Sequence, residues 1–168
     1  EGNWFANYFN NLSPPWDDNM VYSPHKYWNY NDIASIQWMI DLGNNNNVPV
    51  WLGESGENSN TWFRDAITLL ENNDIGWSWW PWKKISSISG PLSVEMTAGY
   101  QDLLDYWNGE GTQLPADSAK KVLMELTEKL KLENCITRRD VIDAMFRQIY
   151  SDETIPFKKN TIPGIIQA

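Results

Sequence analysis

The sequence predicts an α/β fold in which three parallel strands alternate with three helices. Short apolar runs alternate with segments of helical periodicity, which is the usual pattern of βα units. The runs are continuously apolar, as in parallel strands that are buried on both faces. The markers Val21, Val48 and Ile75 follow one another at equal steps of 27 residues. This step suits one βα unit of an eight-fold barrel of about 250 residues, although a doubly wound sheet shows the same alternation.

The predicted strands are short and hydrophobic. They comprise residues 20–22, 48–52 and 75–80. The last run contains Trp77, Trp79 and Trp80, and neighbouring residues of a strand point to opposite faces. We therefore expect at least one of these tryptophans to point into the helix layer as part of the core.

The predicted helices follow the strands, each with recognisable end signals. They cover residues 32–42, 60–72 and 97–108. The first is expected to stop at Gly43, because glycine commonly ends helices. The second repeats Phe63, Ala66, Ile67 and Leu70 at helical spacing, with Ser59 or Asn60 available as N-cap.

The character of the chain changes after Gly111. Residues 115–132 predict an amphipathic helix, and residues 137–150 predict a second, with Thr137 and Asp140 at capping-box spacing. We expect three domains. They are a βα region over 1–112, an outer helical extension over 113–153, and a linker over 154–168.

Composition excludes several classes of function. The net charge of −9 and the pI near 4.5 disfavour nucleic acid, which requires a basic footprint. No apolar run reaches membrane-spanning length, and no metal or cofactor motif is found. Eleven tryptophans suit either a core or a sugar-binding cleft.

Polar and aromatic side chains follow each predicted strand, where a barrel carries its functional residues. His25 to Trp28 follow the first strand, Glu54 follows the second, and Trp82 and Lys83 follow the third. A carboxylate, the single histidine and a tryptophan group are therefore expected to converge on one rim. Lys83 fits a solvated rim equally well.

These residues carry a resemblance to glycoside hydrolase family 5. Trp51–Gly56 resembles the strand-seven motif of that family, and Pro24–Tyr27 resembles its strand-six His-X-Tyr motif. Gly76–Trp82 resembles strand eight, and Glu1–Trp4 resembles the exit of strand five. Order and spacing agree over residues 1–108. The resemblance implies the C-terminal half of a (β/α)8 TIM barrel, from about strand five or six to strand eight.

The resemblance also implies roles for single residues. Glu54 would be the nucleophile of a retaining β-glycosidase, with His25 and Tyr27 around the cleaved sugar. Trp80 is the best match to the tryptophan platform, with Trp79 and Trp82 as alternatives. The expected substrate-binding residues are Trp80, Trp82, Trp28, Trp79 and Lys83. The implied activity is cellulase-like, an endo-β-1,4-glucanase acting on plant cell-wall polysaccharide, with mannan and xyloglucan left open.

One catalytic part is missing from the sequence. A retaining glycosidase needs a second carboxyl group about 5–5.5 Å from the nucleophile to act as acid and base. The Asn-Glu pair that supplies it in family 5 is not present, and Glu57, Glu71 and Glu95 lie in unsuitable contexts. We therefore expect this chain alone to be inactive, and to pair with a missing N-terminal half or with itself. A non-catalytic carbohydrate-binding fragment is the alternative.

The ends of the chain suggest a larger modular protein. The sequence opens in mid-pattern without an initiator Met, which we interpret as a processed or excised piece. Residues 161–168 resemble the opening strand of a family 6 carbohydrate-binding module. Both observations favour a secreted or cell-surface bacterial polysaccharidase.

Overall fold

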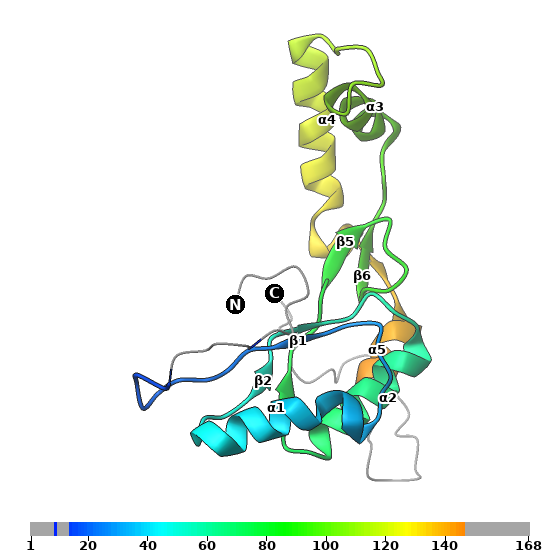
Figure 1. Cartoon of the computed structure of the whole chain (residues 1–168). Helices are drawn as coiled ribbons and strands as arrows, with labels where there is room; N and C mark the ends of the chain where they lie inside the picture. The colour runs from blue at the N-terminus through cyan, green and yellow to red at the C-terminus, as the bar shows by residue number, and fades with distance from the viewer. Residues whose placement is uncertain (1–8, 10–13, 147–168) are drawn as a thin grey trace. The chain divides into compact units, whose positions relative to one another are not determined.

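The computed structural model describes residue 9 and residues 14–146. These residues form a mixed α/β structure (Figure 1). It has five α-helices, and its short strands form three small sheets. The predicted α/β class is therefore confirmed. The chain divides into two compact units, Glu1–Trp79 with Asp140–Ala168, and Trp80–Arg139.

The first unit contains the predicted parallel strands. Its elements are β1 (His25–Lys26), α1 (Ile33–Asn46), β2 (Trp51–Leu52), β3 (Glu54–Ser55), α2 (Asn60–Glu71), β4 (Gly76–Trp77) and α5 (Arg139–Phe146). β1 pairs with β3 and β2 pairs with β4, both in parallel, and a parallel bridge joins Tyr22 to Val50. The three predicted strand segments thus lie side by side in chain order, as consecutive βα units require.

The middle strand segment, which contains β2 and β3, has one residue more than the first segment, which contains β1. Tyr22 is opposite Val50, whereas His25 is opposite Glu54. The chain therefore advances three residues in the first segment and four in the middle one. This register change is a β-bulge, a feature that bends a strand and re-aims its side chains. It falls directly before Glu54.

α1 and α2 cover one face of these strands (Figure 1). The core between them and the strands consists of Ile36, Met39, Leu52, Leu70 and Ile75. Ser59 caps α2 by accepting a hydrogen bond from the backbone N–H of Trp62 at 3.2 Å, as predicted.

The predicted end of α1 at Gly43 is wrong. The helix continues to Asn46, and Asn47 ends it in the left-handed conformation at φ 51°. Gly43 is needed for packing instead. A Cβ at this position would lie 3.0 Å from Val50 Cγ2 and 3.1 Å from the Val48 carbonyl oxygen.

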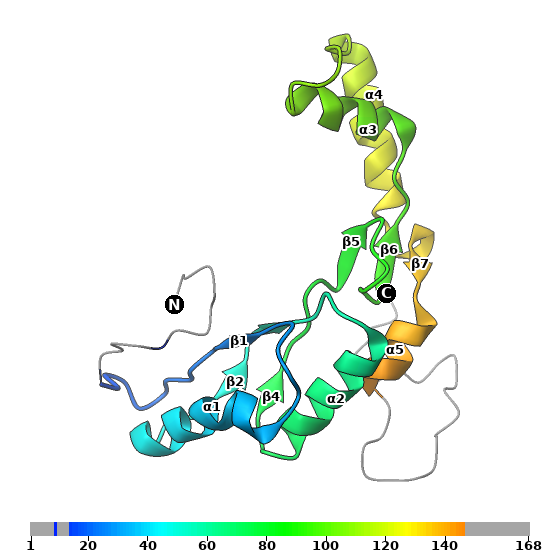
Figure 2. The same cartoon turned by 45° about the vertical axis from the view of Figure 1, so that its right-hand side comes forward.

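α5 packs against α2, and the two helices lie side by side in Figures 1 and 2. Phe63 and Ile67 from α2 meet Val141, Ala144 and Met145 from α5. The predicted capping box at the start of α5 is not formed. Its Thr137 lies in a strand, and Asp140 accepts a hydrogen bond from Asn60 Nδ2 at 2.7 Å.

The second unit contains a small sheet and a helical pair. Its elements are β5 (Lys83–Ile85), β6 (Leu92–Val94), α3 (Ala98–Trp107), α4 (Ala116–Lys129), a 3₁₀ helix η1 (Leu132–Asn134) and β7 (Ile136–Thr137). β6 pairs in parallel with β5 and antiparallel with β7. The short loop 86–91 can connect two parallel strands because each is only three residues long. The sequence did not indicate these strands.

The predicted helices 97–108 and 115–132 are confirmed as α3 and α4, and they pair with each other. Val122 Cγ2 lies 2.6 Å from where a Cβ on Gly99 would stand, so the glycine permits this contact. The compact units do not follow the predicted boundary at residue 112, since α3 and α4 share one unit and α5 belongs to the other. The predicted linker 154–168 lies outside the described residues.

Candidate functional site

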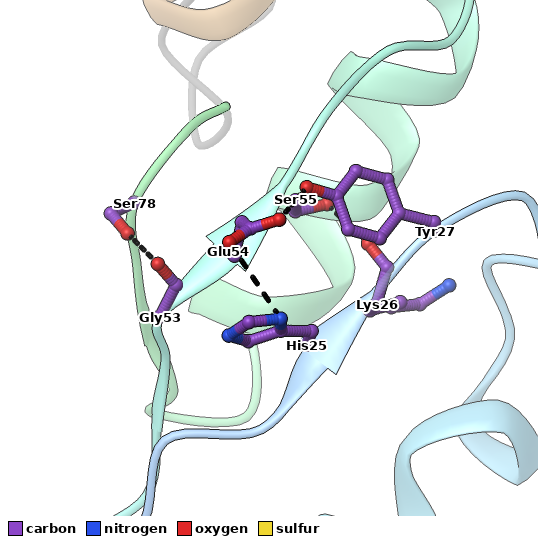
Figure 3. A network of polar contacts seen from close by, with 7 residues as sticks. All are labelled: His25, Lys26, Tyr27, Gly53, Glu54, Ser55 and Ser78. Atoms are coloured by element: carbon purple, nitrogen blue, oxygen red, sulfur yellow. Dashed lines mark hydrogen bonds and ion pairs between the residues drawn. The ribbon is translucent and has the colours of Figure 1, made fainter. Parts of the chain in front are cut away.

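Glu54 stands at the end of the middle strand segment, with Tyr27 hydrogen-bonded to one carboxylate oxygen and His25 near the other. The Tyr27 hydroxyl donates a hydrogen bond to Glu54 Oε1 at 2.5 Å. His25 Nδ1 lies 3.8 Å from Glu54 Oε2. Figure 3 shows the carboxylate between these two side chains. The three residues predicted as catalytic are therefore neighbours in space.

Tyr27 holds its proton firmly in this arrangement. Burial raises the pKa of the Tyr27 phenol most, and the hydrogen bond and negative charge of Glu54 raise it further. The phenol is therefore a hydrogen-bond donor at neutral pH. It fixes the orientation of the carboxylate and leaves the second oxygen directed toward His25.

The backbone at Gly53, directly before Glu54, is tightly constrained. A Cβ on Gly53 would lie 1.9 Å from Ser23 Oγ, so no other residue fits here unless Ser23 moves. Gly53 N–H donates to the Pro24 carbonyl at 3.0 Å, and the Ser78 hydroxyl donates to the Gly53 carbonyl (Figure 3). Glu54 thus follows a residue that is tied to both neighbouring strand segments.

The loop after β1 is held by a buried lysine, Lys26, which no sequence motif indicates. Lys26 is fully buried, and its Nζ donates to Asn29 Oδ1 at 2.6 Å, Tyr30 O at 2.9 Å and Asn31 Oδ1 at 2.9 Å. Its Nζ also lies 4.9 Å from the centre of the Trp62 ring. Nothing in the local pattern marks the residue, because lysines are usually exposed.

Trp28 presents an exposed indole beside Tyr27. The two rings are tilted by 43° with their centres 5.5 Å apart, and Trp28 is 72% exposed. Its Nε1 donates to the Glu57 carbonyl at 3.3 Å, and its backbone has φ 43°. A bulky side chain at positive φ is unusual, so local contacts must hold this conformation.

The remaining predicted substrate-binding residues are placed differently. Trp79 is partly buried and packs against Trp62, Phe63 and Trp77 at the edge of a core cluster, in the direction expected for at least one tryptophan of the third strand. Trp80, Trp82 and Lys83 belong to the second unit. Trp80 and Trp82 are exposed there, and Lys83 Nζ donates to the Leu130 carbonyl at 2.7 Å.

Two of the three alternative carboxylates have partners elsewhere. Glu71 Oε1 accepts a hydrogen bond from Trp77 Nε1 at 3.0 Å. Glu95 Oε2 forms an ion pair with Lys129 at 2.5 Å, in the second unit. Glu57 lies on the same loop as Glu54 and is near enough to raise the pKa of Tyr27. It therefore shares one side of the site with Glu54.

A shallow groove of about 690 Å³ lies at the opposite ends of the strands. It is lined by residues that include Asn44, Asn47, Asn72, Asn73 and Asp74. These residues precede β2 and β4 in the chain, whereas Glu54 follows β2, so the groove is not part of the carboxylate site. Over residues 14–146, no group of three or more potential metal ligands was found, and no helix is long and apolar enough to span a membrane.

Comparison with known proteins gave no match among protein-family models, curated proteins or solved structures.

Proposed function

We propose that this chain is part of a retaining β-glycoside hydrolase of family 5 type, with Glu54 as the nucleophile. In the proposed reaction a Glu54 oxygen attacks the anomeric carbon, and the leaving oxygen takes the electrons of the broken glycosidic bond. The proposed parent is a secreted or cell-surface endo-β-1,4-glucanase. The proposed partner is a β-glucan or a related polysaccharide.

One observation carries the proposal, the short hydrogen bond from Tyr27 to Glu54 with His25 on the other oxygen. A nucleophilic carboxylate must be accessible and held in line for attack. The Glu54 side chain is 35% exposed, so it is open to a ligand while Tyr27 fixes one of its oxygens. The adjacent Trp28 indole supplies an apolar surface of the kind on which a pyranose ring stacks.

The proposed fold is the second half of a (β/α)8 barrel. Three parallel strand segments in chain order, separated by α1 and α2, support this architecture. In such a barrel the acid/base carboxyl would come from strand four, and this sequence has no Asn-Glu pair that matches it. We therefore propose that a polysaccharide is cleaved only when a second barrel half completes the site.

A substrate with an activated leaving group tests the proposed nucleophile, because its cleavage does not require the missing acid. The proposed reagent is 2,4-dinitrophenyl 2-deoxy-2-fluoro-β-cellobioside, whose phenolate leaves without being protonated. Attack by Glu54 would form an ester bond to the anomeric carbon and release one dinitrophenolate. We expect one equivalent of label on the Glu54 peptide by mass spectrometry, and none in Glu54→Gln. Glu57→Gln on the same loop is the matched control and should retain the label.

Label on a different residue, or no label on a folded chain, would refute the proposed nucleophile. Turnover of unactivated β-glucan by the chain alone, abolished by Glu54→Gln, would refute the proposed need for a second barrel half.

The exposed Trp28 supports a second candidate, a carbohydrate-binding fragment without catalysis. In that case cello-oligosaccharides would bind and Trp28→Ala would abolish binding, while Glu54 would remain unlabelled. Isothermal titration and the labelling reaction together distinguish the two functions.

A further inference from the structure

We infer that Lys26 is the positioning residue of this site, acting through the loop formed by residues 27–31. The inference deepens the proposed function and rests on it for its catalytic meaning. Its structural part stands on the contacts of Lys26 alone.

The ammonium group of Lys26 binds the loop that follows it. Two of its acceptors are the side chains of Asn29 and Asn31, and the third is the backbone carbonyl of Tyr30. An ammonium has three donors, and all three are used within this loop. The group therefore folds the chain into a tight turn around itself.

The same loop is fastened to α2 through Trp62. Trp62 Nε1 donates to the Asn29 carbonyl at 2.8 Å, and Asn31 Nδ2 donates to the Trp62 carbonyl at 3.0 Å. The Trp62 ring also faces the Lys26 ammonium at 4.9 Å, within the range of a cation–π contact. Lys26 is thus enclosed by its own loop and by the helix behind it.

Tyr27 and Trp28 are the first two residues of this loop. The Ser55 hydroxyl donates to the Lys26 carbonyl at 2.7 Å, which joins the start of the loop to the residue after Glu54. Removal of the ammonium would leave the loop without its central donor, in a buried position that water does not reach. We expect the Tyr27 hydroxyl then to leave Glu54, and the Trp28 indole to lose its fixed direction.

Burial lowers the pKa of Lys26 to about 8, so the test is made near pH 6, about two units lower, where the ammonium is intact. It follows the ¹⁹F chemical shift of Tyr27 in the full chain labelled with 3-fluorotyrosine, assigned by its loss in Tyr27→Phe. In Glu54→Gln we expect the signal to move toward those of the exposed tyrosines, because the phenol loses its carboxylate acceptor. In Lys26→Met the signal should move in the same direction and to a similar extent.

Controls separate this effect from general loss of stability. Lys129→Met removes an exposed lysine in the second unit and should leave the Tyr27 ¹⁹F chemical shift unchanged. The double variant Asn29→Ala/Asn31→Ala keeps the lysine but removes two of its acceptors, and should shift the Tyr27 signal as Lys26→Met does. This double variant serves as the test if Lys26→Met does not fold.

An unchanged Tyr27 ¹⁹F chemical shift in these folded variants would overturn the inference, whatever the labelling of Glu54 shows. If Glu54 is not labelled in the wild type but the Tyr27 signal moves as expected, the proposed function fails and Lys26 remains the residue that positions Tyr27. If both hold, Lys26→Met should also slow the labelling of Glu54 at least about tenfold, since it misplaces a residue that orients the nucleophile.

Discussion

At the scale of single residues, the site depends on small side chains as much as on reactive ones. Gly53 precedes Glu54 and leaves no space for a Cβ, because Ser23 Oγ would be 1.9 Å away. The sequence showed a glycine before a glutamate at the end of a strand, which was enough to select Glu54. It could not show that the Ser23 hydroxyl, thirty positions earlier, occupies the space that a Cβ would take.

We expect Gly53→Ala to destabilise the chain by about 1–3 kcal/mol, as overpacking of a filled site usually does. The free energy of unfolding from urea titration measures this. Ser23→Ala alone should have little effect, and the double variant should recover most of the loss, because the clashing oxygen is then absent. Additive losses in the double variant would contradict the steric explanation.

Among the residues of the site, the sequence indicated the reactive side chains but not the buried lysine. His25, Tyr27 and Glu54 were selected because each follows an apolar run, and the parallel pairing of β1 with β3 brings them together. Lys26 was missed because a buried lysine is rare, and its burial depends on Trp62 of a helix thirty-six positions away. Local sequence does not contain such contacts.

At the scale of elements, the positions of the helices were predicted better than their ends. Apolar spacing located α1, α2 and α4, and α3 was expected because its residues follow the third predicted strand and end before Gly109. The end of α1 was misplaced because two kinds of signal compete there. Gly43 is a common terminator, but the structure uses it for close packing, and Asn47 adopts the left-handed conformation that ends the helix.

Asn47 therefore gives a prediction for this element. Asn47→Ala should destabilise the chain by about 1 kcal/mol, because alanine pays the steric cost of the left-handed region that asparagine tolerates better. Asn47→Gly should be neutral or stabilising, since glycine adopts φ 51° without that cost. Thermal unfolding followed by circular dichroism measures both. Asn45→Ala, inside the same helix and exposed, is the control and should not destabilise.

Short strands were the least predictable elements. β5, β6 and β7 contain only two or three residues each, too few to establish a period of two. Thr137 illustrates the consequence. Its spacing to Asp140 suggested a helix cap, whereas its backbone pairs with Leu92 in a sheet. Pairing with the distant Leu92 places Thr137 in a strand, and the sequence near Thr137 does not indicate this pairing.

At the scale of the whole molecule, the strands of the first unit are covered by helices on one face. Leu52 points into the core with α1 and α2, so its neighbour Trp51 points to the opposite face. Trp51 is 43% exposed there, and Val21, next to the buried Tyr22, is 51% exposed. Parallel sheets are normally buried on both faces. Within the described residues, the apolar groups on this second face are not fully covered.

We expect the chain to associate with a second copy through this face when its proposed barrel partner is absent. Sedimentation velocity over a range of concentrations should show a monomer–dimer equilibrium, and Trp51→Ser should raise its Kd at least about tenfold, equivalent to about 1.4 kcal/mol. Trp16→Ser is the matched control, because Trp16 is 79% exposed and not part of the paired strands. Its Kd should equal that of the wild type. A monomer at all concentrations with a cooperative melt would show that the exposed face around Trp51 needs no cover, and it would remove the main physical reason for expecting a second barrel half.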